Sequence, residues 1–267
     1  MESRAILGVV CAGALALTLA AARADVTQTG QYALPQGKPK IVSRLSLKPS
    51  GDLIINQYAS GSHRPIAACA SRSPKAPCYV PTEDEAVHVI LVRDDFGEFS
   101  HIHPQRTNGV YSIHVALEPR HRYYAFVASR LSGMPEQVFR FVLQPAAGPA
   151  HTTATTLKPS AKATAGPYQL LLDQRRVHAG KTQTLNADIR RDPHAPGIAP
   201  YHVAWVRAIL VNTSSLTYGH IDIALDQGIC CEYALRTPAL SKGLYKMWLQ
   251  FDDGNAIYTA PFTFVAQ

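Results

Sequence analysis

The sequence predicts an all-β protein made of two tandem β-sandwich domains that follow a signal peptide. Three observations lead to this prediction. Short segments rich in Val, Ile, Tyr and Phe alternate with breaks of Gly, Pro and Asp, as strands and turns do. One block of sequence recurs in the second half of the chain. A polar stretch rich in Ala and Thr separates the two halves.

The expected strands are short, and no segment carries the apolar stripe and capping residues of an amphipathic helix. In the first half we expect strands at 41–47, 52–58, 87–92, 98–103, 110–116, 123–128 and 137–143. In the second half we expect them at 168–173, 181–189, 203–211, 216–224, 233–236, 244–251 and 261–265. About seven short strands in roughly 100 residues is the size of an immunoglobulin-like sandwich, which is the fold expected for both domains.

The internal repeat indicates a duplication. Residues 88–103 and 207–222 align without a gap, and Ile-Leu-Val and His-Ile are identical in the two copies. Two later blocks also correspond, 122–129 with 243–250 and 139–144 with 262–267.

The stretch between the copies has almost no large apolar side chains, so it cannot bury enough surface to offset its ordering entropy. We therefore expect a first domain at 28–145, a linker at 146–166 and a second domain at 167–267.

The first residues, 1–24, predict a secretory signal peptide. Arg4 precedes an apolar run over 5–22, and Ala22-Arg23-Ala24 has the small-x-small form of a cleavage site. The alternative is an uncleaved membrane anchor, for which the run is slightly short, and no later stretch approaches membrane-spanning length. The mature chain is expected to start at Asp25, in the bacterial periplasm or outside the cell.

The formal net charge of the chain is +7, and loss of Arg4, Arg23 and Glu2 with the signal peptide lowers it to +6. The Lys and Arg residues are scattered rather than clustered. This distribution does not indicate a nucleic-acid partner.

Export places the four remaining cysteines in an oxidising compartment, where they allow three pairings. Cys69 and Cys78 bracket a polar loop, and we expect a disulfide that closes it. Cys230 and Cys231 would then form a vicinal bridge, remain thiols or bind metal, and the bridge is preferred.

The strongest functional signal is a predicted hairpin that contains His88, His101 and His103. His101 and His103 are two residues apart, so they share one face of a strand. A two-residue turn at Asp94-Asp95 would place His88 opposite His101. A four-residue turn over 94–97 would place it opposite His103. Either register puts the three imidazoles on the same side of the hairpin.

Three converging imidazoles can bind copper(II), zinc or nickel. We prefer copper, with zinc as the alternative, and the free coordination position could take water or one of His114, His121 and His63. Met134 is the only methionine of the mature first domain, which argues against a methionine-rich copper(I) site. The alternatives are hydrogen-bonded histidines at the edge of the core and a pH-sensing patch.

The second copy departs from this pattern. Arg207 and Asp222 occupy the positions of His88 and His103, and only His220 is retained. Since a cation and an anion replace two ligands, we expect an Arg207–Asp222 salt bridge beside His220 and no metal in this copy.

The first copy resembles the YtkA-like and copper-resistance-associated β-sandwich domains of the bacterial envelope. The residues that carry the resemblance are His88, Asp95, Phe99, His101, His103 and Pro104, with Tyr123 and Tyr124 on a later strand. The resemblance is weaker in the second copy. It implies a periplasmic or extracellular protein that handles copper or another heavy metal.

These observations lead to three hypotheses of decreasing preference. The first is a non-enzymatic, extracytoplasmic metal-binding protein for metal handling or resistance. The second is a metal-free envelope module that contacts a protein partner, because a sandwich fold alone does not fix function. The third is a metallo-enzyme that uses a carboxylate of Asp94, Asp95 or Glu98 as a base, although turn formation explains the aspartates better.

Overall fold

The computed structural model describes residues 40–69, 77–79, 86–145, 156–192, 197–200, 204–223 and 232–267, and the backbone alone of 25–31 and 228–229. The described part contains strands and no helix, so it offers no helix that could cross a membrane. The predicted signal peptide, Cys230 and Cys231 lie outside the described residues.

The N-terminal unit, 25–145, consists of two antiparallel sheets. One sheet has the order β1 (Asp25–Gln31), β9 (Gln137–Gln144), β8 (Tyr123–Ser129), β4 (Val87–Arg93), β5 (Phe99–Ile102). The other has the order β2 (Ile41–Leu47), β3 (Asp52–Ala59), β7 (Val110–His114), β6 (Gln105–Thr107). Their facing side chains form one buried core that includes Leu53, Ile55, Val89, Leu91, Val127 and Phe141.

The C-terminal unit, 156–267, also consists of two sheets. The first has the order β12 (Arg176–Val177), β19 (Ile257–Ala266), β18 (Gly243–Asp252), β14 (Val206–Asn212), β15 (Tyr218–Ile223). The second has the order β10 (Lys162–Ala165), β11 (Tyr168–Leu172), β13 (Gln183–Arg191), β17 (Glu232–Thr237), β16 (Gly228–Ile229).

The two units share a strand order, which is the structural counterpart of the sequence repeat. The series β9-β8-β4-β5 of the N-terminal unit corresponds to β19-β18-β14-β15, and β2-β3-β7-β6 corresponds to β11-β13-β17-β16. Two boundaries differ from the prediction. Strand β10 lies inside the stretch 146–166 that is expected to be a linker, and it forms a hairpin with β11. Strand β1 begins before residue 28.

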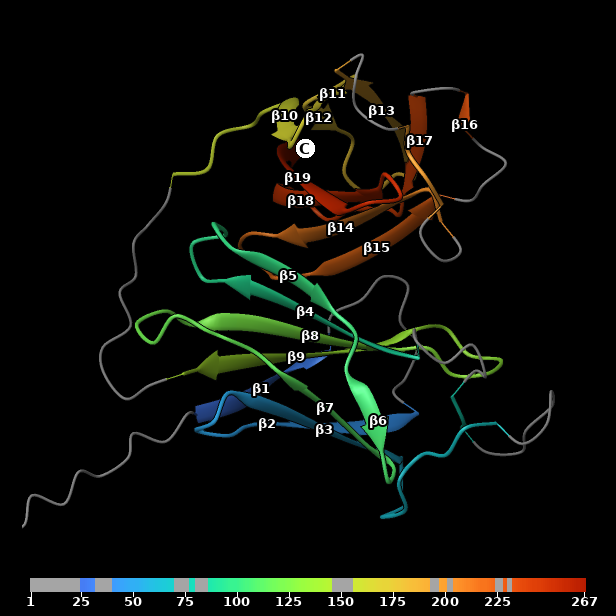
Figure 1. The fold of residues 1–267 in the computed structure, drawn as a ribbon. Helices are drawn as coiled ribbons and strands as arrows, with labels where there is room; N and C mark the ends of the chain where they lie inside the picture. Colours follow the sequence, from blue (N-terminus) through green and yellow to red (C-terminus); the bar gives the residue numbers. More distant parts are fainter. Residues whose placement is uncertain are drawn as a thin grey trace, which may run out of the picture.

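An apolar cluster separate from the cores of the two units joins them. Strand β4 is buried on both faces: Val89 and Leu91 face the core of their own unit, while Ile90 and Val92 face the C-terminal unit. This explains why β4 is a continuous apolar run rather than an alternating one. Strand β14 does the same with Ile209 and Val211. The four sheets therefore form four stacked layers, with β4 and β14 in the two middle layers (Figure 1).

Aromatic rings fill the contact between the two middle sheets. Phe99 of β5 stacks on Trp248 of β18 with ring centroids 4.6 Å apart. Phe126 of β8 stacks on Tyr218 of β15 at 5.3 Å. These contacts bury the face of β4 and β5 on which the predicted histidines lie.

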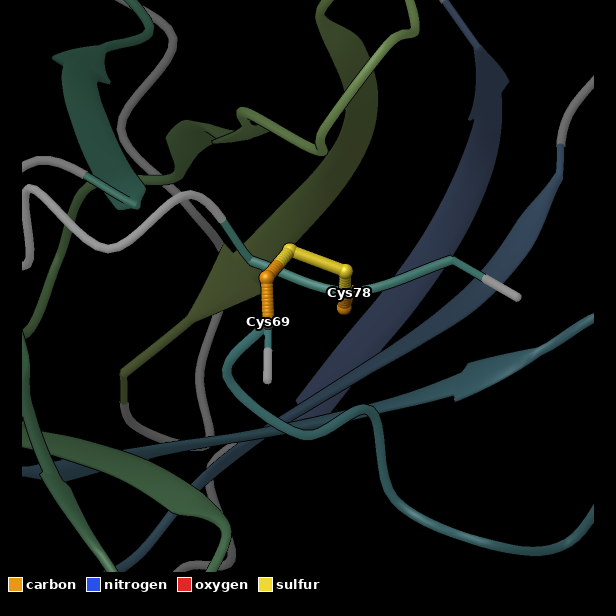
Figure 2. Close-up of a disulfide and its surroundings, with 2 residues drawn as sticks. All are labelled: Cys69 and Cys78. Carbon is orange, nitrogen blue, oxygen red and sulfur yellow. A yellow bond between two sulfur atoms is a disulfide. The ribbon is translucent and has the colours of Figure 1, made fainter. Parts of the chain in front are cut away.

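A disulfide joins Cys69 and Cys78, as the sequence predicts (Figure 2). On either side of the bond, the backbone N–H of Cys69 donates to the carbonyl of Tyr79, and the N–H of Tyr79 donates to the carbonyl of Ala67. Tyr79 is buried, so the disulfide holds the segment that carries this ring against the N-terminal unit.

Candidate metal centre

The register of the β4–β5 hairpin determines which histidines face one another. Ile90 pairs with His101 and Val89 with Ile102, so the next pair along the ladder is His88 with His103. The backbone N–H of Arg93 donates to the carbonyl of Glu98, which leaves the four-residue turn 94–97. Of the two registers that the sequence allowed, the hairpin adopts the four-residue one.

The acidic residues of this turn serve its structure. The carboxylate of Asp95 accepts hydrogen bonds from the N–H of Gly97 at 2.8 Å and from Nε of Arg93 at 2.9 Å. Asp94 lies 3.0 Å from Nδ1 of His121. Phe96 has a φ of 59°, a conformation that tight turns require. The aspartates therefore stabilise the hairpin at the end opposite to the histidines.

The three predicted imidazoles converge on one point. His88 Nδ1 lies 3.0 Å from His101 Nε2 and 3.1 Å from His103 Nε2. One nitrogen of each ring lies within 4.8 Å of the other two, and these rings form the group of potential metal ligands found in the described part of the chain. His88 is 1 % exposed, and His101 and His103 are partly buried. The cluster could hold a metal ion.

Burial favours the neutral form of His88 and of His101. Desolvation is the main cause that lowers the pKa of His88 far below its usual range, and the neighbouring His101 and His103 lower it further. Desolvation also lowers the pKa of His101 to about 3, against the opposing effect of its hydrogen bond to Gln250. Neutral imidazole is the form that binds metals, because its lone pair is not occupied by a proton.

Within the cluster, His88 Nδ1 faces two other ring nitrogens. Gln250 Nε2 donates to Thr259 Oγ1, so Gln250 Oε1 accepts the Nδ1–H of His101 at 2.8 Å. His101 Nε2 then carries a lone pair that points toward His88 Nδ1. There is room for one proton on His88 Nδ1 between the two facing nitrogens, whereas a cation between the rings could be bound by all three lone pairs.

The degenerate copy of the hairpin covers the site from the C-terminal unit. Arg207 and Asp222 are paired across β14 and β15, with Arg207 Nε 3.2 Å from Asp222 Oδ1. His220 Nε2 lies 3.0 Å from the same carboxylate oxygen. The His220 ring is centred 6.0 Å from that of His88. The expected ion pair beside His220 is thus present, and it lies against the histidine cluster of the other unit.

Charged residues of the two units meet beside the cluster. Arg130 of the N-terminal unit donates to Asp222 Oδ2 at 2.7 Å, and His220 Nδ1 lies 3.8 Å from Glu136. Burial opposes a charge on His220, but the nearby carboxylates of Asp222 and Glu136 raise the pKa of His220 to about 9. Burial likewise opposes the charge on Asp222, yet His220, Arg207 and Arg130 hold the pKa of that carboxyl well below its usual range.

A cavity lies beside the histidine cluster. It is partly open, has a volume of about 340 Å³ and is lined by His103, Pro104, Arg106, Tyr79 and Tyr111 among others. The Arg106 guanidinium lies over both tyrosine rings and donates to the carbonyl of Ile66 at 2.7 Å, which fixes that part of the lining. His103 therefore has one side toward the cluster and another toward solvent.

The other predicted ligands do not join the cluster. His114 is exposed and lies 3.2 Å from Asp52, and His121 is held by Asp94. His63 lines a separate surface depression with Arg44 and Tyr58. The expectation that one of these histidines supplies a fourth ligand is therefore wrong for the described structure. Cys230 and Cys231 lie outside the described residues, so their vicinal bridge stays a prediction.

Gln250 is the site residue that the sequence does not reveal. It comes from β18, far along the chain from the histidines, and no motif marks it. The only available signal is a polar residue between Leu249 and Phe251 in a strand that is otherwise mostly buried.

A comparison with known families matches the C-terminal unit, and the matched span does not include the histidine hairpin. A family model described as Domain of unknown function (DUF8832) matches residues 162–267, a span that starts with β10 and ends with the chain. No curated protein matches the sequence. The C-terminal unit is therefore similar to a domain family that carries no assigned activity.

Proposed function

We propose that the protein is a non-enzymatic, extracytoplasmic metal-binding protein that takes part in metal handling or resistance, with His88, His101 and His103 as its ligands. The observation that carries this proposal is the meeting of three ring nitrogens, one from the buried His88 and two from the partly buried His101 and His103, with separations of 3.0 and 3.1 Å from His88 Nδ1.

The spacing suits a transition metal. Metal–nitrogen bonds of about 2.0–2.1 Å in a tetrahedral arrangement require ligand nitrogens roughly 3.3 Å apart. Two of the observed separations are within a few tenths of an ångström of this value. The third nitrogen pair lies within 4.8 Å, so small rotations of the rings would complete three sides of the tetrahedron.

Copper is the metal we propose, with zinc as the alternative. Imidazole binds both ions, and the cluster contains no sulfur ligand that would favour copper(I). Met134 instead packs against the apolar core of the N-terminal unit. The fourth position would take water or a small ligand that enters through the cavity beside His103.

Export to the periplasm or the cell surface, after removal of 1–24, is part of the same proposal. The Cys69–Cys78 disulfide supports it, because such bonds persist in oxidising compartments. The paired antiparallel sheets are consistent with two immunoglobulin-like sandwiches in the expected domains 28–145 and 167–267.

The proposal is tested by metal content and affinity. The chain from residue 25 would be dialysed against copper(II) or zinc, its bound metal measured, and its affinity determined by calorimetry. We expect one ion per chain, and loss of high-affinity binding in the His101→Ala/His103→Ala variant. The matched control is His114→Ala, which removes an exposed histidine outside the cluster and should leave binding unchanged. Equal binding by all three proteins would overturn the proposal.

A further inference from the structure

One histidine of the cluster is hydrogen-bonded to the other unit. His101 Nδ1 donates to Gln250 Oε1 at 2.8 Å, across 149 residues of sequence. The amide of Gln250 cannot rotate freely, because its Nε2 donates to Thr259 Oγ1 at 3.1 Å on the neighbouring strand β19. A chain of two hydrogen bonds therefore runs from the C-terminal unit to one of the three proposed ligands.

These two hydrogen bonds determine the tautomer of His101. Because Gln250 presents an oxygen, the neutral imidazole of His101 keeps its proton on Nδ1 and its lone pair on Nε2. Nε2 is the nitrogen that faces His88 and the meeting point of the cluster. Without the acceptor, the proton could occupy either nitrogen, and the Nε2-protonated form cannot bind an ion at that point.

The equivalent positions of the N-terminal unit lack this polar pair. His88 of β4 pairs with Ala128 of β8, and Ala128 pairs with Val138 of β9. In the C-terminal unit, Arg207 occupies the position of His88, and the two following positions are Gln250 and Thr259. One copy thus keeps the imidazoles, while the other has lost two of them and has polar groups where the first has apolar ones.

We propose that Gln250, held by Thr259, is a positioning residue for the metal site, and that the two units form complementary halves of one centre. The N-terminal unit supplies the ligands, and the C-terminal unit fixes the orientation and tautomer of His101. This inference rests on the proposed metal-binding function. Its closest physical precedent is the general observation that metal-binding histidines donate their second N–H to an oxygen, whose removal lowers affinity about 10- to 100-fold.

The experiment compares copper(II) and zinc affinity of the chain from residue 25 in three variants. Gln250→Leu removes the acceptor with little change in volume, and we expect a loss of affinity of about 10- to 100-fold. Gln250→Glu keeps an oxygen acceptor and should restore affinity to at least that of the unchanged protein. Thr259→Val releases the amide and should cause a smaller loss than Gln250→Leu.

A second measurement distinguishes positioning from folding. Nitrogen-15 NMR of the metal-free protein reports which His101 nitrogen carries the proton. We expect Nδ1–H in the unchanged protein and in Gln250→Glu, and a mixture of tautomers in Gln250→Leu. Unchanged tautomer and unchanged affinity in Gln250→Leu would overturn this inference while leaving metal binding in place. Absence of metal binding in the unchanged protein would instead overturn the proposed function.

Discussion

Arg207 and Asp222 lie directly opposite each other on β14 and β15, at the positions that His88 and His103 occupy in the first hairpin. Arg207 is only 2 % exposed, and the carboxylate of Asp222 beside it stabilises its buried positive charge. Arg130 and His220 share the same carboxylate group. The charged side chains of the second hairpin, together with Arg130, therefore form an ion cluster that joins the two units.

Replacement of Asp222 by Asn should strongly destabilise the protein. The change leaves the buried Arg207 without its carboxylate, and loss of one partner from a buried ion pair costs roughly 3–5 kcal/mol. Urea unfolding would measure the free energy of unfolding. The double variant Arg207→Leu/Asp222→Leu should lose less than Asp222→Asn, because it removes the buried charge as well. A larger loss in the double variant would contradict this account.

The stability of the metal-free protein should be highest near pH 6.5. His101 has its pKa lowered from 6.5 to about 3, so the unfolded chain binds more protons as the pH falls below 6.5, and the folded state loses stability. His220 has its pKa raised to about 9, so its contribution is complete below 6.5 and is lost as the pH rises through 9. Urea unfolding in a chelator between pH 4 and pH 10 measures both sides of this maximum.

Two histidine variants separate these effects. His220→Gln should flatten the alkaline decline and leave the acid decline in place. His178→Gln changes an exposed histidine and should alter neither side. An alkaline decline that persists in His220→Gln would show that another group is responsible.

Trp248→Ala should weaken the contact between the two units. The indole stacks on Phe99 and is 3 % exposed, and removal of a buried aromatic side chain costs about 3–5 kcal/mol. We expect the two units to unfold in separate transitions, which calorimetry would resolve. Ile257→Ala removes a side chain that is 49 % exposed and serves as the control. A single transition with unchanged midpoint in Trp248→Ala would argue against a coupled interface.

Removal of the Cys69–Cys78 disulfide should cost about 2–3 kcal/mol, because the bond closes a short loop and limits the freedom of the unfolded chain. The variant is Cys69→Ala/Cys78→Ala, and denaturant unfolding is the measurement. Adding reductant to the unchanged protein should give the same loss. Stability that reductant does not change would mean that the bond does not form in the protein.

Much of the fold follows from local sequence patterns. The enrichment in Val, Ile, Tyr and Phe, together with the breaks at Gly, Pro and Asp, marks β2 and most other long strands to within two or three residues at each end. The sequence does not predict the short strands β6, β12 and β16, since two or three residues carry no recognisable period. It does not predict β10 either, because Lys162–Ala165 has the composition of a linker and is held by pairing with β11.

The sequence shows the repeat, but it aligns the later blocks out of register. In the sequence alignment Gln250 corresponds to Ser129, whereas strand pairing makes Ala128 its equivalent. Likewise, Phe262 corresponds to Phe141 rather than to Phe139. Alternating apolar strands resemble themselves when displaced, so the sequence alone did not fix their register.

The hairpin geometry was predictable because two alternatives both placed the histidines on one face. The packing of the C-terminal unit against the histidines was not predictable from the sequence. The continuous apolar run Val89–Val92 indicated a strand buried on both sides, but the identity of the second partner depends on how two distant sheets pack. Gln250 belongs to that partner, and its role therefore becomes visible only in the folded protein.

The most direct test of the central claim is X-ray absorption spectroscopy of the chain from residue 25 loaded with one equivalent of copper(II). The account predicts three imidazole nitrogens at about 2.0 Å from the metal, and a reduced imidazole contribution in the His101→Ala/His103→Ala variant. A spectrum with oxygen ligands alone, or one that the double variant leaves unchanged, would contradict it.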